Sequence, residues 1–367
     1  MSKNLTRRGL LAAAPALAAL SALHPRQAWP APPAGPLQVG FLYPTPLLAA
    51  GWSAQHDEGR RHLAQALGEQ VRTRQVASVA EGPDAERVLR ELVADGCRLI
   101  VAASFGYLES VLRVAADHPG TVFEHISGYR ATANVGFANA RFYEGRYLAG
   151  LAAGGVSRSG VAGYVAAFPI PEVVQGINAF ALGLRAANPA ASLKVIWTQS
   201  WHDPGRERDA AQTLLGQGAD VLTNHTDSPA VPIAAQAAGR WCVGYHSDQR
   251  AFAPEAQLTA VTHHWGEFYT ASAQAVIEGR WRNSALWGGV RQGMVRLAPF
   301  GAAVPAAVRR QVALRQAELA AGRGHPFAGR LVDNEGRVRQ ESGTLSDDAL
   351  ARMNWYVQGV QGRLPGG

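Results

Sequence analysis

The sequence predicts an α/β protein made of two doubly wound, parallel-sheet lobes. Helix and strand patterns alternate along the chain, and one block of helix, strand, turn, helix and strand occurs twice. The length of 367 residues also exceeds what a single core usually holds. Strands that alternate with helices form parallel sheets, and ligands bind beyond the carboxyl ends of such strands. The turns that follow those strands are therefore the places where a site is expected.

The N-terminal segment has the features of an export leader. Paired arginines, Arg7 and Arg8, precede an Ala/Leu-rich run over residues 10–22 that is too short to span a bilayer, and residues 23–36 are rich in proline. We expect residues 1–31 to be a twin-arginine signal peptide and linker. No cysteine lies nearby, so a lipid anchor is not expected, and the predicted location is the periplasm.

Composition argues against two classes of protein. The formal net charge is +7, and removing the four basic residues of the leader lowers it to +3, with the remaining basic residues scattered. A nucleic-acid-binding protein would cluster them on one face. No later apolar run reaches the roughly 20 residues of a membrane-spanning helix. The two cysteines, Cys97 and Cys242, lie at predicted strands, and their spacing does not indicate a disulfide.

The predicted elements follow the hydrophobic pattern in order along the chain. A strand over residues 37–43, a loop over 44–51 and a helix over 53–67 come first. The first copy of the repeated block has these elements: helix 85–94, strand 99–103, turn 104–106, helix 107–116 and strand 121–125. The second copy has these elements: helix 207–215, strand 219–222, turn 223–228, a further helix and strand 241–245. We also expect a strand over 161–167, a helix over 302–322 and a hairpin over 325–344.

Aromatic side chains stand at the ends of several predicted strands. Trp52 follows the first strand, Phe105 lies in the turn after residue 103, and Phe168 follows the strand that ends at 167. Together they would form a slot for a flat ring. The alternative is that each one only covers the surface of a lobe.

Carboxylates occupy two strand-end turns of the second half. Asp227 and Asp248 would accept hydrogen bonds from N–H groups of a neutral ligand. For Asp227, capping of the following helix is an equal alternative. Glu207 and Asp209, next to arginines, are interpreted as a solvated helix face.

Histidines raise the question of a metal. His225, His246, His263 and His264 would lie near one cleft, but no HxH or HExxH spacing is present, and no metal site or cofactor is predicted. Phosphate-binding, nucleophile-elbow and CxxC motifs are absent from the sequence as well.

Long motifs resemble the basic membrane protein family of ABC-transporter substrate-binding proteins, which is related to purine nucleoside receptors. The motifs cover residues 139–150, 163–180 and 354–360, within a resemblance that runs from Val39 to Val360. The resemblance implies a type I periplasmic-binding-protein fold whose lobes are joined by three hinge crossovers and close on a ligand. It divides the chain into lobe 1, residues 37–138 plus 263–300, and lobe 2, residues 139–262 plus 301–360.

The chain departs from nucleoside-binding members of this family at several positions. Trp52-Ser53 replaces a Phe-Asn pair, and the run from Gly244 to Gln249 keeps Asp248 but carries His246 where the family has aspartate. His263-His264-Trp265 stands where a ribose-contacting lysine is expected. The loss of polar contacts and the gain of an indole favour a free base over a nucleoside. The ligand-binding set that we expect is Trp52, Ser53, Phe105, Gly106, Phe168, Asp227, Asp248 and Trp265.

The resulting hypothesis is a receptor of an ABC importer that binds a purine base such as adenine and passes it to an inner-membrane permease. We expect a monomer that uses no cofactor, binds no nucleic acid and is not an enzyme. One alternative is the same fold binding a nucleoside or a non-purine aromatic solute, with Arg141 and Arg146 as counter-charges for a carboxylate. The remote alternative is a nucleoside-processing hydrolase.

Overall fold

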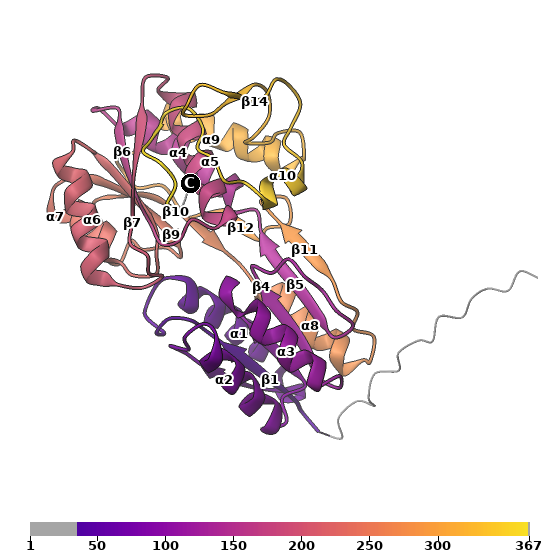
Figure 1. Cartoon of the computed structure of the whole chain (residues 1–367). Coiled ribbons are helices and arrows are strands. Elements are labelled where there is room, and N and C mark those ends of the chain that lie inside the picture. The colour runs from indigo at the N-terminus through magenta and orange to yellow at the C-terminus, as the bar shows by residue number, and fades with distance from the viewer. Residues whose placement is uncertain (1–34, 366–367) are drawn as a thin grey trace, which may run out of the picture.

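Each of the two lobes is centred on a mainly parallel β-sheet in the computed structural model, which describes residues 35–365 (Figure 1). The signal peptide and linker predicted over residues 1–31 lie outside this range. The sheet of lobe 1 has the spatial order β11-β5-β4-β3-β1-β2. Its strands are β1 (Leu37–Leu42), β2 (Val71–Val76), β3 (Leu99–Ala102), β4 (Val122–Ile126), β5 (Val135–Ala140) and β11 (Ala285–Gly288).

The sheet of lobe 2 has the order β12-β10-β9-β8-β6-β7-β15, and β12 is antiparallel to β10. Its strands are β6 (Val161–Ala166), β7 (Ser192–Trp197), β8 (Val221–His225), β9 (Trp241–His246), β10 (Gln257–His263), β12 (Val295–Leu297) and β15 (Val360–Gln361). The first strand of each lobe lies between the second and the third strand of that lobe. The order in which strands are added to the sheet therefore reverses beside β1 and beside β6. Ligands bind at such a point in doubly wound sheets.

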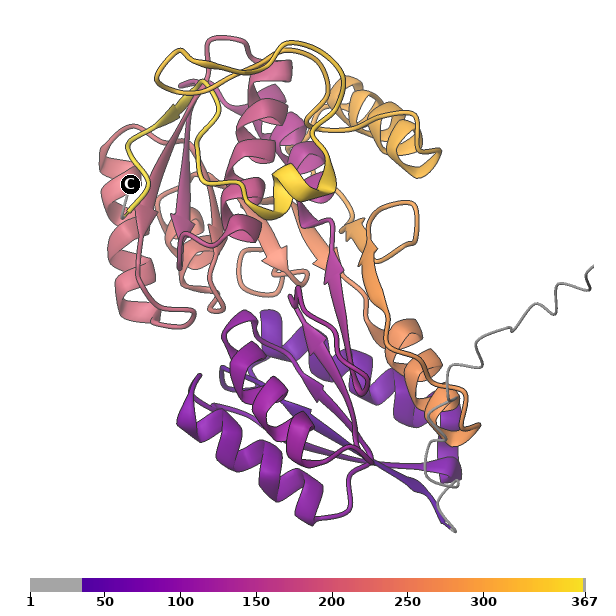
Figure 2. The ribbon, with the colours of Figure 1, turned by 45° about the vertical axis from the view of Figure 1, so that its right-hand side comes forward.

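Helices cover the sheets of both lobes (Figure 2). They are α1 (Trp52–Leu67), α2 (Pro83–Ala94), α3 (Leu108–Asp117), α4 (Phe142–Val156), α5 (Pro171–Ala187), α6 (Pro204–Gly216), α7 (Ala230–Ala237), α8 (Gly266–Ile277), α9 (Ala306–Ala320) and α10 (Asp347–Ala351). A short hairpin of β13 (Leu331–Val332) and β14 (Val338–Gln340) lies in the region where the sequence predicts one.

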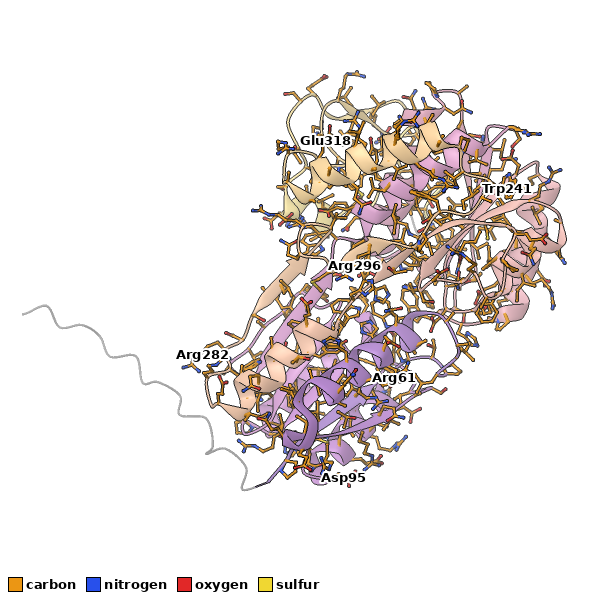
Figure 3. All side chains as sticks on the ribbon, turned by 180° about the vertical axis from the view of Figure 1, so that it is seen from behind. Arg61, Asp95, Trp241, Arg282, Arg296 and Glu318 are labelled. Atoms are coloured by element: carbon orange, nitrogen blue, oxygen red, sulfur yellow. The ribbon has the colours of Figure 1, made fainter. Side chains whose placement is uncertain are left out.

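The described chain passes between the lobes three times, from β5 to α4, from β10 to α8 and from β11 to β12. The predicted lobe limit at residue 300 is too late, because β12 already pairs with β10 in the sheet of lobe 2. Figure 3 shows side chains filling the junction, with Arg296 of β12 labelled there. Both sheets therefore lie close to the hinge segments that connect them.

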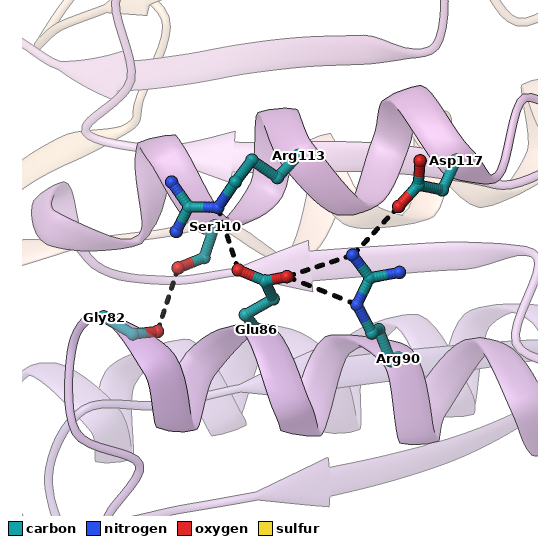
Figure 4. A network of polar contacts seen from close by, with 6 residues as sticks. All are labelled: Gly82, Glu86, Arg90, Ser110, Arg113 and Asp117. Carbon is teal, nitrogen blue, oxygen red and sulfur yellow. Dashed lines mark hydrogen bonds and ion pairs between the residues drawn. The ribbon is translucent and has the colours of Figure 1, made fainter.

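Lobe 1 shows how the predicted elements form. Helix α2 presents Val88, Leu89 and Leu92 to the sheet, and Gly96, with φ of 85°, ends the turn that leads to β3. On the solvent side, Glu86 bridges Arg90 and Arg113, which links α2 to α3 (Figure 4). These charges are exposed, so packing of the apolar face does most of the work of stabilising the pair.

Glycines bring α4 and α5 into close contact in lobe 2. A Cβ atom at Gly150 or Gly183 would collide with backbone oxygen atoms of the facing helix. The backbones of the two helices are thus in direct contact, next to the sheet of lobe 2.

We predict that Gly150→Ala lowers the free energy of unfolding by about 1–3 kcal/mol, because the added methyl must push α5 away. Urea denaturation of the purified protein measures this change. Gly216→Ala, at the end of α6, is the matched control, since a Cβ there meets nothing within 4 Å. It should leave stability unchanged or raise it slightly. Equal losses in both variants would contradict the close-packing argument.

Candidate ligand-binding cavity between the lobes

A cavity lies where the carboxyl ends of the strands from both lobes meet, and its empty space, including the part open to solvent, is about 400 Å³. Its lining consists of Pro44, Thr45, Trp52, Ser104, Phe105, Ser127, Ile170, Glu172, Trp201, His225, Thr226, Asp227 and His246.

Aromatic rings form part of the wall of the cavity. Trp52, the first residue of α1, donates its indole N–H to the carbonyl of Ala103 at 2.7 Å, which fixes the ring beside the end of β3. Phe105 follows β3 in a short 3₁₀ turn. Trp201, in the loop after β7, was not anticipated from the sequence, and Phe168 packs edge-on against it with centroids 5.0 Å apart. The cavity thus offers flat apolar surfaces from both lobes.

Asp227 connects lobe 2 to lobe 1. Its carboxylate accepts hydrogen bonds from the Thr45 hydroxyl and from the backbone N–H of Trp52, at the N-terminus of α1. Of the two alternatives, capping of α7 is not what the structure shows, because Pro229 is the N-cap of that helix and the N–H of Ala230 donates to Ser228, not to Asp227. The carboxylate instead serves the first turn of a helix in the opposite lobe, where the helix dipole favours negative charge.

The loop that carries Asp227 is held by Glu207, and here the sequence interpretation was wrong. Glu207 is fully buried, not part of a solvated helix face, and its carboxylate accepts hydrogen bonds from Thr226 at 2.8 Å and Ser228 at 2.6 Å. A buried carboxylate needs such donors to offset its lost hydration. Glu207 thus fixes the position of Asp227 from behind.

Glu172 is a second buried carboxyl group at the cavity and was also missed by the sequence analysis. It lies in the first turn of α5, and Ser127 at the end of β4 donates to it across the lobes at 2.9 Å. Burial raises the pKa of Glu172 to about 7, and burial likewise raises the pKa of Asp227 to about 7 against the effect of its donors. The sequence did contain a signal for Glu172, because this acid comes directly after the Pro-Ile-Pro turn that follows a predicted strand.

Histidines complete the polar part of the lining. Nε2 of His225 lies 3.8 Å from Oε1 of Glu172, and His246 ends β9 with φ of 67°. Burial lowers the pKa of both imidazoles well below the usual value, so both are neutral. Two buried polar atoms of the lining, Nε1 of Trp201 and Nδ1 of His225, have no hydrogen-bond partner within residues 35–365. A bound polar molecule would meet such groups.

The structure brings Trp52, Phe105 and Asp227 of the predicted ligand-binding set into the cavity lining. Two others lie immediately beside it: Ser53 is buried and hydrogen-bonded to Thr45, and Gly106 donates its N–H to Glu81 at 3.1 Å. Their contacts with a ligand stay predictions.

The remaining three predicted residues lie outside the cavity lining. Phe168 supports Trp201 from behind. The Asp248 side chain is 41% exposed and accepts a hydrogen bond from Gln257 at 2.6 Å. Trp265 is buried in the hinge beside His263, to which its indole N–H donates.

The two arginines considered as counter-charges are also absent from the cavity lining. Arg141 pairs with Asp347 at 2.7 Å on another side of lobe 2. Arg146 is fully buried and lies over the Tyr245 ring, with its Cζ 3.3 Å from the centroid. No lysine or arginine lines the cavity in the described part of the chain. An anionic ligand would therefore find no direct counter-charge there.

Two further features bear on the sequence predictions. Among residues 35–365, no group of three or more His, Cys, Asp or Glu side chains is placed to hold a metal ion, and Cys97 and Cys242 are free and buried in different lobes. Over the same residues, no helix is long and apolar enough to cross a membrane.

A cavity between two doubly wound lobes is typical of solute-binding proteins. Residues 37–319 match the model of the PnrA-like ABC transporter substrate-binding proteins, and the chain belongs to this family.

Two curated relatives align over most of the chain. A purine-binding protein of Brucella abortus is 43% identical over 330 residues, which cover 90% of this chain and 94% of the relative. A Haloferax volcanii protein, provisionally named an ABC transporter glucose-binding protein, is 38% identical over 333 residues, 90% of this chain and 81% of the relative. Two relatives of this chain are thus named for chemically different ligands.

Solved structures of solute-binding proteins share the fold. One from Conexibacter woesei aligns with a TM-score of 0.66 at 24% identity, covering 79% of this chain and 98% of that chain. Another, from Aeropyrum pernix, aligns with a TM-score of 0.70 at 17% identity, covering 86% of this chain and 95% of that chain. The expected type I periplasmic-binding-protein fold is confirmed.

The raised pKa of Glu172 predicts a pH-dependent cost to stability. The group has a higher pKa when folded than when unfolded, so its favourable contribution is present below about pH 4.5 and is lost as pH rises through about 7. We expect Glu172→Gln to gain stability relative to the parent protein by about 1–3 kcal/mol between pH 5 and pH 8.

Urea denaturation of both proteins at the two pH values, without added ligand, tests this prediction. The matched control is Glu109→Gln, which replaces an exposed acid on α3. Its stability difference from the parent should not change with pH over this range. A stability difference for Glu172→Gln that does not change with pH would show that burial does not raise the pKa of Glu172.

Proposed function

We propose that this chain is a periplasmic receptor that binds a free purine base between its lobes and delivers it to the permease of an ABC importer. The observation that carries the proposal is the composition of the cavity: aromatic walls and two buried carboxyl groups, with no cationic side chain in the lining among the residues that the structure describes. Purine bases are flat, neutral and rich in N–H donors, so they suit aromatic walls and carboxylate acceptors.

A base is preferred to a nucleoside because of the residues that this chain carries. It lacks the amide and the lysine of nucleoside-binding members of the family, with Ser53 and the His263-His264-Trp265 run in their places. The purine-binding relative supports the ligand class at 43% identity.

The receptor role also has consequences for location and partners. The predicted twin-arginine signal would place the protein in the periplasm, where a monomer without a lipid anchor would meet the permease. Closing of the lobes would trap the base and present a surface that the open form lacks. No cofactor enters this role, and no catalytic step is assigned to the cavity.

Calorimetric titration of the mature protein, refolded to remove any carried-over ligand, tests the proposal. The panel consists of adenine, hypoxanthine, guanine, adenosine, inosine, uracil and glucose. Tight binding of a base and weak binding of its nucleoside is the expected result. Equal binding of nucleosides would overturn the preference for a base, and binding of glucose alone would overturn the purine assignment.

We predict that Trp52→Ala weakens binding of the preferred base by roughly 1–3 kcal/mol, the loss expected when a stacking surface is removed. Titration calorimetry of the variant measures this loss. Trp241→Ala is the matched control, because Trp241 begins β9 at the end of the strand away from the cavity (Figure 3). Unchanged affinity in Trp52→Ala would remove this residue from the site.

A further inference from the structure

A hydrogen-bonded chain of three buried side chains runs from the hinge to the cavity. The indole Nε1 of Trp265 lies 2.5 Å from Nδ1 of His263, and Nε2 of His263 lies 3.1 Å from Nδ1 of His246. Trp265 and His263 stand where the chain leaves β10 for lobe 1, and His246 ends the neighbouring strand β9. All three side chains are at most 3% exposed, so water does not compete for these contacts.

The direction of this chain is set at its hinge end. An indole N–H can only donate, so Nδ1 of His263 must accept and carries no proton. Burial lowers the pKa of His263 and of His246 well below the usual value, which keeps both rings neutral. A neutral imidazole carries one N–H, and in His263 it must then be on Nε2. That N–H donates to Nδ1 of His246, so the proton of His246 is on Nε2.

The surroundings of His246 point to a ligand as the partner of this last N–H. His246 lines the cavity, and its Nε2 has no hydrogen-bond partner in the described part of the chain. Its backbone has φ of 67°, a conformation that is costly for a residue with a side chain. Rings on several sides fix its plane, with the Trp52 centroid at 5.2 Å and the Tyr245 centroid at 3.9 Å.

We propose that His246 is a fixed hydrogen-bond donor that determines specificity, and that Trp265 and His263 are the positioning residues that fix its tautomer. This rests on the proposed function only for the identity of the ligand. His246 would donate to an unprotonated ring nitrogen or a carbonyl oxygen of the base, while the carboxyl groups of the cavity accept from its N–H groups. A ligand with an N–H at the position facing His246 would leave two donors opposed and would be rejected.

The tautomers can be observed directly without knowledge of the ligand. Long-range ¹H–¹⁵N correlation spectra of the protein labelled at histidine should show both His246 and His263 protonated at Nε2 only. Trp265→Phe removes the single obligate donor and should give mixed tautomers at both residues. Trp197→Phe is the matched control, since it removes an indole N–H that donates to Tyr356 at 3.1 Å in lobe 2, and it should change neither.

A proton on Nδ1 of His246 in the parent protein, or unchanged tautomers in Trp265→Phe, would overturn the proposal. Because the spectra of the parent protein need no variant, a Trp265→Phe protein that fails to fold does not prevent the test.

Binding of base analogues tests the role in specificity. The panel consists of adenine and its 1-deaza, 3-deaza and 7-deaza analogues. Each analogue has CH in place of one ring nitrogen of adenine. One of the three should bind the parent protein about three- to tenfold more weakly than adenine, the loss expected for one hydrogen bond. In His246→Phe that difference should vanish, and in His246→Gln, which keeps an N–H donor, part of it should return.

These outcomes separate the inference from the proposed function. If no purine binds, the proposed function fails while the tautomer spectra still decide the proton positions. If adenine binds but all three analogues bind equally well, or if the difference persists in His246→Phe, His246 is not the donor and the receptor role stands.

Discussion

The cavity of this protein depends on contacts between the two lobes, and the contact between Asp227 and the first turn of α1 is central among them. The strands of both lobes end at this place, where the two sheet edges face each other. Asp227 from lobe 2 accepts hydrogen bonds from Thr45 and from the Trp52 N–H of lobe 1. The backbone N–H of Trp52 thus binds lobe 2 through Asp227, and the indole ring of the same residue forms part of the cavity wall.

Neighbouring contacts act in the same direction and share its energetic character. Ser127 donates to Glu172 at 2.9 Å, and the Gly51 N–H donates to Ser247 at 2.9 Å, both across the lobes. The carboxyl groups lose hydration on burial, and their donors offset only part of that loss, as their raised pKa values indicate. Such contacts add little net stability, but they form only when donor and acceptor are accurately placed. These properties suit a contact between lobes that must form around a ligand and later release it.

The fold could be predicted closely because its signals are local. The strand and the helix expected over residues 37–43 and 53–67 appear as β1 and α1, and the repeated block appears in both lobes. β2 was missed because Arg72 and Arg74 give an edge strand a charged, exposed face that does not resemble a buried strand. β5 was missed because Gly136 and Asn139 interrupt its apolar pattern.

The site could be predicted only in part, since its residues come together through topology and not through spacing. The strand-end rule found Trp52, Phe105 and Asp227. It missed Trp201 because no strand was predicted over the residues of β7, so the loop after it was not considered. It fails for Asp248 because the chain turns at His246, which takes the cavity position itself, and leaves Asp248 beside Gln257. Glu207 was misjudged because its donors are not visible in the local pattern: the buried hydroxyl groups of Thr226 and Ser228 are distant in sequence, and the third donor is the backbone N–H of Asp203.

The direction of β1 has a practical consequence. Its carboxyl end faces the cavity, so its first residue, Leu37, lies at the opposite edge of the lobe 1 sheet. Any segment joined ahead of this strand enters the folded body on the side remote from ligand and hinge. An affinity tag, a fluorescent label or a surface tether attached there would leave entry to the cavity and movement of the lobes unobstructed, which makes this end the natural point of immobilisation for a sensor.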